Sequence, residues 1–152
     1  MSADFLPDTR PTAPTPCPCR IKGPGQSRLG AAAPDYSACC ARFHHTSAIP
    51  PTAEALMRSR YTAFVLGETE YLLATHHHTT RPASLMFDPD IEWLGLKILA
   101  KTEDGDTATV EFVARMRSAG KQHRMHEVSL FQREGGRWFY VDGTFPDRAK
   151  RR

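Results

Sequence analysis

The sequence predicts an α+β fold, in which helices pack on one side of a curved antiparallel sheet and a small cysteine motif precedes them. Three observations support this class. All four cysteines lie between residues 17 and 40. Apolar residues recur with helical spacing between residues 51 and 67, and from residue 91 onward they alternate with polar ones, as in strands. Helices followed by a run of strands joined by short turns are typical of α+β domains.

The composition is that of a globular protein with about one domain. The chain has 152 residues, of which 40% are hydrophobic and 24% are charged. A formal net charge of +3 is too small to predict a nucleic-acid partner. No apolar run approaches the ~20 residues that span a bilayer, and the N-terminus does not resemble a secretory signal. We therefore expect a cytoplasmic protein without a membrane partner, whose thiols stay reduced.

The cysteines form two close pairs that suit a single metal ion. Neighbouring cysteines rarely reach disulfide geometry with each other, whereas Zn²⁺ takes four soft ligands in a tetrahedron. The predicted zinc ligands are Cys17, Cys19, Cys39 and Cys40. His44 or His45 is an alternative fourth ligand, and unligated thiols or a redox pair are the alternatives to a metal. Four sulfur ligands leave no open position for a substrate, so the predicted zinc is structural.

The two ends of the chain carry no periodic pattern of apolar residues. Residues 1–16 are rich in proline and threonine, which is typical of a disordered arm. Residues 146–152 form a basic tail, which we interpret as a frayed and solvated end. The cations of this tail are Arg148, Lys150, Arg151 and Arg152.

A helix is predicted from Pro51 to Gly67. Thr52 suits its N-cap, Glu54 complements the positive end of its dipole, and Gly67 suits a left-handed ending. One side of this helix is apolar, through Leu56, Met57, Tyr61, Phe64 and Val65. Arg60 falls inside the apolar side, where its guanidinium either finds a structural partner or lines a cavity.

A second, shorter helix is predicted from Glu68 to about His76. Three consecutive histidines, His76 to His78, end this segment. Consecutive side chains on regular structure point in different directions, so we do not expect them to form a metal site. Pro82 and Pro89 then indicate an irregular connection to the sheet.

Four strands joined by short turns are predicted after Ile91. The turns fall at residues 103–106, 118–121 and 134–137, and the fourth strand covers residues 138–142. In the first strand, Leu94, Leu96, Ile98 and Ala100 share one face, and Trp93, Gly95 and Lys97 share the other. In the second strand, Ala108, Val110, Phe112, Ala114 and Met116 share one face, opposite Glu111 and Arg115.

Several segments together resemble one bacterial family. They read CPC, YSACCARFH, TAEALMRSRYTAFVLGETEYLLATHH, TRPAS, WLGLKIL, VEFVAR, HEVSLF and GRWFYVDG. Between residues 17 and 143 the chain is similar to the YchJ family. This resemblance implies a SEC-C zinc motif over residues 17–45 and a separately folded, cone-shaped domain like nuclear transport factor 2 over residues 46–145. The loop between Cys19 and Cys39 is longer than in similar SEC-C motifs, and Cys40 stands where some of them have histidine.

A cone closed by helices is a typical place for a small-molecule pocket. The residues expected inside it are Arg60, Tyr61, His77, Trp93, Glu111, Arg115, His126, Glu127 and Trp138. Adjacent strand residues face opposite ways, so His126 and Glu127 cannot act together directly. An acid–base pair therefore needs His126 opposite Glu111 or Asp142. Otherwise Glu127 must lie opposite His77 or Arg60, and its simplest role is to neutralise Arg60 in the core.

Two functions fit these expectations. The first is a zinc-stabilised interaction module, whose cysteine motif binds a protein partner while the cone is a scaffold or holds a small-molecule ligand. The second is an isomerase-like or dehydratase-like enzyme that uses a histidine and a glutamate inside the cone, an analogy that rests on the fold alone. We favour the module. A cone filled by aromatic side chains supports it, whereas an open pocket with a histidine beside a carboxylate supports the enzyme.

Overall fold

The computed structural model describes residues 16–22 and 34–146 of the chain. Apart from Pro16 and Pro146, the predicted N-terminal arm and basic tail lie outside the described residues. Most of the loop between the two cysteine pairs also lies outside them.

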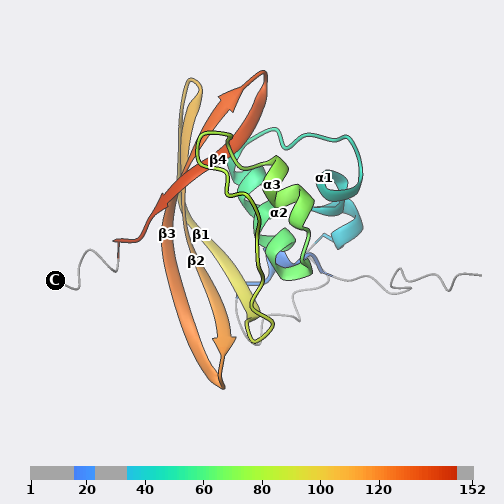
Figure 1. Ribbon diagram of the computed structural model, residues 1–152, viewed down its shortest axis with the longest axis vertical. Helices are drawn as coiled ribbons and strands as arrows, with labels where there is room; N and C mark the ends of the chain where they lie inside the picture. Colours follow the sequence, from blue (N-terminus) through green and yellow to red (C-terminus); the bar gives the residue numbers. More distant parts are fainter. Residues whose placement is uncertain (1–15, 23–33, 147–152) are drawn as a thin grey trace, which may run out of the picture.

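The fold has two layers, a group of helices and a curved four-stranded sheet (Figure 1). The helical elements are η1 (Pro18–Arg20), η3 (Tyr36–Ala38), α1 (Ala41–His45), α2 (Ala53–Leu66) and α3 (Thr69–Ala74). The strands are β1 (Glu92–Asp104), β2 (Thr107–Ser118), β3 (Lys121–Glu134) and β4 (Arg137–Thr144), and they pair antiparallel in this order. The helices lie against one face of the sheet. The predicted α+β class is confirmed.

Helix α2 begins and ends as its sequence predicts. The Thr52 hydroxyl oxygen accepts a hydrogen bond of 3.0 Å from the Ala55 N–H, and Gly67 closes the helix with φ of 75°. Leu56 and Tyr61 point into the core and are buried. No helix among the described residues is long and apolar enough to cross a membrane.

The sheet differs from the predicted pattern in its first strand. Register shifts between Trp93 and Gly95 and between Ile98 and Ala100 interrupt the pairing of β1 with β2. Trp93 consequently packs against Tyr61 of α2, with ring centres 5.7 Å apart, on the same side as the buried Leu96. Simple alternation predicted opposite faces for Trp93 and Leu96, because it takes no account of the inserted residue.

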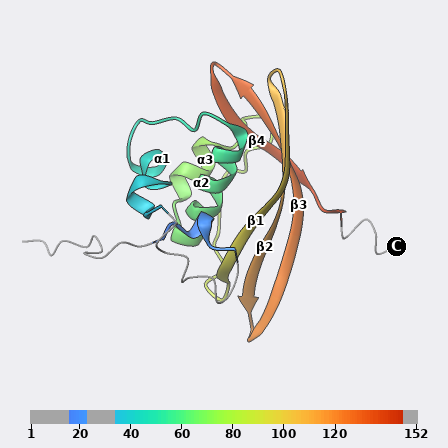
Figure 2. The same ribbon diagram turned by 180° about the vertical axis from the view of Figure 1, so that it is seen from behind.

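The cysteine motif packs directly against the two-layer body. Segment η1 lies beside α2 and β1 (Figure 2), and the Leu96 N–H donates to the Ile21 carbonyl at 2.7 Å. The four cysteines belong to the same cluster of buried residues as Leu56 and Phe131. The motif and the helix–sheet body therefore share one hydrophobic core. Separate folding of the body stays a prediction.

Candidate metal centre

The four predicted ligands meet in one buried cluster. The Sγ atom of Cys19 lies 3.6 Å from that of Cys39 and 3.6 Å from that of Cys40. With Cys17, all four sulfur atoms lie within 4.8 Å of one another. All four side chains are buried, and all are free thiols. Two segments that are distant in the sequence thus present four thiols to one point.

The sulfur spacing fits a single tetrahedral ion. Zinc–sulfur bonds measure about 2.3 Å, so the edges of a ZnS₄ tetrahedron measure about 3.8 Å. The two separations of 3.6 Å are close to that value. Four buried thiolates also require a cation, since an uncompensated charge away from water is unfavourable. The cluster is therefore consistent with a metal site, and its sulfur ligands suit soft or borderline metals.

Without a cation, the thiols compete for protons. Hydrogen bonding with Cys19 lowers the pKa of Cys17 to about 7, and hydrogen bonding with Cys17 lowers the pKa of Cys39 as well. Contacts within the same cluster raise the pKa of Cys19 and of Cys40. Because metals bind thiolates, an incoming ion displaces the shared protons. We therefore expect metal affinity to fall as the pH falls.

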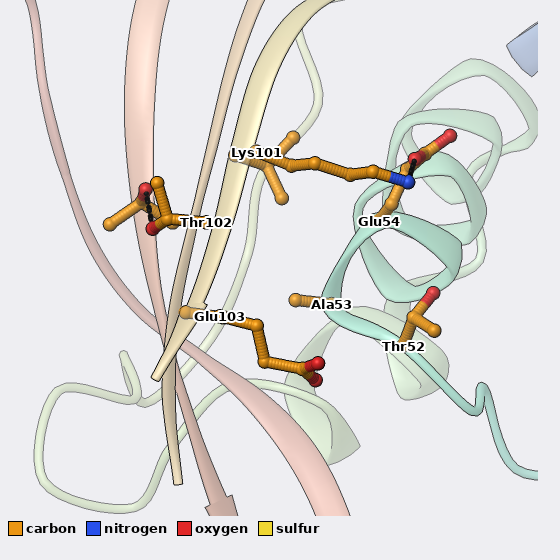
Figure 3. A pocket seen from close by; sticks show the side chains of 9 residues that line it. Thr52, Ala53, Glu54, Lys101, Thr102 and Glu103 are labelled. Atoms are coloured by element: carbon orange, nitrogen blue, oxygen red, sulfur yellow. Dashed lines mark hydrogen bonds and ion pairs between the residues drawn. The ribbon is translucent and has the colours of Figure 1, made fainter. Parts of the chain in front are cut away.

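Side chains of α2 connect the cysteine cluster to the sheet. Nη1 of Arg58 donates to the Cys19 carbonyl at 2.6 Å, and Nε of Arg58 donates to Glu54 at 2.9 Å. Lys101 of β1 donates to the other Glu54 oxygen at 2.8 Å, across the hollow shown in Figure 3. The first cysteine pair is thus held through Arg58 and Glu54 to β1. The sequence analysis missed this role of Arg58, although its spacing of four residues from Glu54 indicates a helical ion pair.

The two nearby histidines have other partners than the metal site. Nε2 of His44 lies 2.8 Å from the Ser59 carbonyl, to which it must donate. Nδ1 of His44 then accepts from the Tyr36 hydroxyl at 2.9 Å. His45 contacts the same hydroxyl at 3.2 Å and lies 3.9 Å from Glu68. The structure therefore places the four cysteines together and leaves both histidines outside the cluster.

Inside the fold, Arg60 and Glu127 are linked by Tyr140 rather than by a direct ion pair. Nη1 of Arg60 donates to the Leu72 carbonyl and to the Thr75 hydroxyl, both at 2.8 Å. Its guanidinium carbon lies 4.6 Å from the centre of the Tyr140 ring, and the Tyr140 hydroxyl donates to Glu127 at 3.2 Å. Burial lowers the pKa of Arg60 to about 10, so it stays charged at neutral pH.

The carboxylate of Glu127 is contacted by neighbouring residues on more than one side. The Ser129 hydroxyl donates to the same Glu127 oxygen at 2.6 Å. The backbone of Gly143 faces this carboxylate so closely that an added Cβ would lie 2.2 Å from its oxygen. Glu127 therefore has the contacts of a structural group in a filled interior.

His126 and Glu111 form the expected pair, but on the other face of the sheet. Nε2 of His126 lies 2.6 Å from a Glu111 oxygen. Glu111 pairs with Val128 on β3, and His126 pairs with Val113 on β2. Between these two pairs, Phe112 pairs with Glu127, and both of these residues are buried on the side of the helices. The expectation that Glu111, Arg115 and His126 lie inside the cone is corrected by this alternation.

Most of the remaining interior candidates have packing roles. Tyr61 and Trp93 pack ring against ring, as described above. Trp138 is buried under the guanidinium of Arg133, which lies 5.0 Å from its ring. The indole nitrogen of Trp138 has no hydrogen-bond partner among the described residues. His77 is also buried, but it lies toward the end of the β3–β4 hairpin, beside Glu134.

Four hollows of the described surface show where ligands could be held. Their volumes are about 450 Å³ beside Trp93, about 300 Å³ beside Cys19, about 240 Å³ beside Thr52 and about 100 Å³ beside Trp138. None of these four is lined by Arg60, His77, Glu111, His126 or Glu127. The residues expected to do acid–base chemistry are thus not gathered around any of these hollows.

Comparisons with known proteins agree with this architecture. Residues 52–143 match the family model described as the middle NTF2-like domain of YchJ. A UPF0225 protein from Polaromonas naphthalenivorans is 50% identical over 131 residues, which cover 85% of this chain and 96% of the relative. A UPF0225 protein from Streptomyces coelicolor is 49% identical over 136 residues, which cover 87% of this chain and 97% of the relative.

Two solved structures have a similar fold. A SEC-C motif-containing protein from Rhodopseudomonas palustris, determined in solution, aligns with a TM-score of 0.68 and 32% identity over 74% of this chain and 93% of that one. The crystal structure of a SEC-C motif-containing protein from Psychrobacter arcticus aligns with a TM-score of 0.69 and 29% identity over 86% and 82% of the two chains. The cysteine cluster, the helix-covered sheet and these likenesses agree, and the chain belongs to the YchJ-like UPF0225 family.

Proposed function

We propose that this protein is a zinc-stabilised interaction module of the cytoplasm, in which the SEC-C motif and the first strand together form a surface for an acidic protein segment. The observation that carries the proposal is the burial of four sulfur atoms at tetrahedral spacing within the core shared by α2 and β1. A metal with four sulfur ligands has no position left for a substrate. Its role is to fix the shape of the motif.

The proposed metal is zinc. Four thiolates in a tetrahedron are a typical zinc ligand set, and a reducing compartment keeps the thiols available. Arg20 and Arg58 border the cluster: the charge of Arg20 interacts with Cys39, and Arg58 donates to the Cys19 carbonyl. These cations would offset the negative charge of a zinc–tetrathiolate centre.

The proposed binding surface is the hollow of about 300 Å³ beside Cys19. Ile98 and the buried Leu96 give it an apolar floor, and Lys22 and Lys97 stand at its border. Within residues 16–22 and 34–146, neither lysine has a carboxylate at ion-pair distance. A partner segment with carboxylates around an apolar side chain would complement both the charge and the floor.

The surface is tested with a synthetic peptide rich in glutamate and leucine. The double charge reversal K22E/K97E should weaken peptide binding at least tenfold, measured by fluorescence anisotropy at two salt concentrations. The matched control R115E/K121E changes the charge equally on the β2–β3 hairpin and should bind like the wild type. Equal peptide affinities for all three proteins would refute the proposed binding surface. Point variants are preferable to deletion of the motif, because deletion would uncover Leu56 and Leu96.

The metal assignment has its own test. Elemental analysis of the untagged protein should find zinc, and Co²⁺ exchanged into the cysteine site should show thiolate-to-cobalt charge-transfer absorption. Both signals should disappear in C19S/C39S. A wild-type protein without sulfur-bound metal would refute the assignment, whatever the peptide experiment shows.

The enzyme alternative has less support. Its strongest feature is the contact between His126 and Glu111, but this pair lies on the face of the sheet that the helices do not cover. The interior carboxylate of Glu127 is held by Ser129 and Tyr140. Tyr61 and Phe64 pack against Trp93 on the helix side, as expected of a scaffold.

A further inference from the structure

A second cluster of metal-ligating side chains lies at the end of the β3–β4 hairpin, away from the cysteines. The segment after α3 pairs with β4: the His77 N–H donates to the Tyr140 carbonyl at 2.7 Å, and the Tyr140 N–H donates to the Thr75 carbonyl at 2.9 Å. This pairing brings His77 and His78 next to Glu134. One ligand atom from each of these three residues lies within 4.8 Å of the others.

The side chains of His77 and His78 converge on one carboxylate oxygen of Glu134. Its Oε2 atom lies 2.8 Å from Nε2 of His77 and 3.6 Å from Nε2 of His78. The two imidazole rings stack, with centres 4.3 Å apart and planes at 28°. The sequence predicted that consecutive histidines would diverge, but residues 77 and 78 follow the helix in irregular backbone, where that rule does not apply.

Nε2 of His77 is the atom that most clearly indicates a ligand. The His77 side chain is only 4% exposed. Its Nε2 atom is buried and makes no hydrogen bond among the described residues, although it lies at an ion-pair distance of 2.8 Å from a Glu134 oxygen. A buried nitrogen without a hydrogen bond is unfavourable, because it has lost its contact with water. A cation between the imidazoles and the carboxylate would give this atom a partner.

The other side of the His77 ring is held by Thr79. Its Nδ1 atom lies 2.6 Å from the Thr79 hydroxyl oxygen, and it accepts a hydrogen bond of 3.2 Å from the Thr79 backbone N–H. Metal-ligating histidines commonly donate their second ring N–H to a nearby oxygen, which orients the ring. With the proton on Nδ1, the Thr79 hydroxyl accepts it, the longer contact to the backbone N–H is given up, and Nε2 is free to bind.

We propose that His77, His78 and Glu134 form a second binding site, for a divalent transition metal such as Zn²⁺. Two neutral imidazoles and one carboxylate are a known zinc ligand set that leaves one position for water. His78 and Glu134 are 68% and 43% exposed, so an ion can enter from solvent while His77 anchors it from the interior. The site shares no residue with the cysteine cluster.

The test uses the untagged full-length protein with its cysteine site filled with zinc. Isothermal titration with Zn²⁺ should show one further ion per chain. A parallel titration with Co²⁺ should give ligand-field bands without new thiolate charge transfer, since the added ion has nitrogen and oxygen ligands. His77 is left intact because its replacement would disturb the core.

Two exposed ligands supply the decisive variants. H78A and E134Q should abolish saturable binding of the second ion, and T79V should weaken it about 10–100-fold through loss of the outer partner. H123A, at an exposed histidine of β3, is the matched control and should bind like the wild type. The proposal is overturned if the wild type takes up no second ion, or if H78A and E134Q bind as tightly as H123A. Neither result bears on the cysteine site, whose charge-transfer band is read separately.

Discussion

The guanidinium carbon of Arg60 lies over the ring of Tyr140, 4.6 Å from its centre, while the hydroxyl of the same ring donates to Glu127. One aromatic ring thus separates a buried cation from a buried carboxylate and contacts both. This arrangement satisfies the two charges without direct contact, and it occupies the interior in which the sequence suggested a catalytic pair.

The link through Tyr140 predicts unequal costs for two substitutions. Y140F keeps the ring under Arg60 and removes one hydrogen bond to Glu127, so it should lower the free energy of unfolding by about 1 kcal/mol. R60M leaves the carboxylate of Glu127 without its cation and should lower the free energy of unfolding by about 3–5 kcal/mol. Urea unfolding at pH 7 measures both, and equal losses would contradict the proposed role of Arg60.

Removal of the metal should destabilise the whole protein. Because the cysteines share a core with Leu56 and Phe131, a strong chelator should lower the midpoint of thermal unfolding by on the order of 10 °C. The near-ultraviolet signal of Trp93 and Trp138 should change in the same single transition. Two separate transitions, with the sheet unaffected by the chelator, would instead indicate an independent knuckle.

Substitution of Gly143 should disturb the interior carboxylate. In G143A the new methyl group would clash with Glu127, which Ser129 and Tyr140 hold in place. We therefore expect the free energy of unfolding to fall by about 1–3 kcal/mol. T144A, one residue later and exposed, is the control and should stay within about 0.5 kcal/mol of the wild type. A G143A protein as stable as T144A would show that the carboxylate moves aside freely.

Acid should destabilise the fold partly through His76. Burial lowers its pKa from 6.5 to about 4, helped by the positive charges of Arg60 and Arg81. The folded state therefore favours the neutral ring. The resulting contribution to folding stability is present above pH 6.5 and is lost as the pH falls towards 4. The stability difference between the wild type and H76Q should shrink over that range. H123Q controls for loss of a surface histidine, and a constant difference between wild type and H76Q would contradict the shift.

Sequence reasoning succeeded where the determinants are local. Thr52 and Gly67 delimit α2 because a cap and a left-handed ending depend on a few neighbouring residues. The convergence of two cysteine pairs followed from the chemistry of four thiols. The position of Trp93 depended instead on a register shift that alternation does not reveal. The contact of His77 with Glu134 needed the pairing of residues 75–77 with β4, which is a tertiary event.

The register shift in β4 decides which residue meets the interior carboxylate. Phe131 pairs with Tyr140, but Leu130 pairs with Asp142, so Val141 is an extra residue that leaves Gly143 opposite Ser129. If Val141 were paired regularly with Leu130 instead of being bulged out, Asp142 would come opposite Ser129 and a second acid would turn towards Glu127. The bulge at Val141 thus keeps two like charges on opposite faces of the sheet, and regular pairing of the same residues would set them against each other beside the one arginine, Arg60.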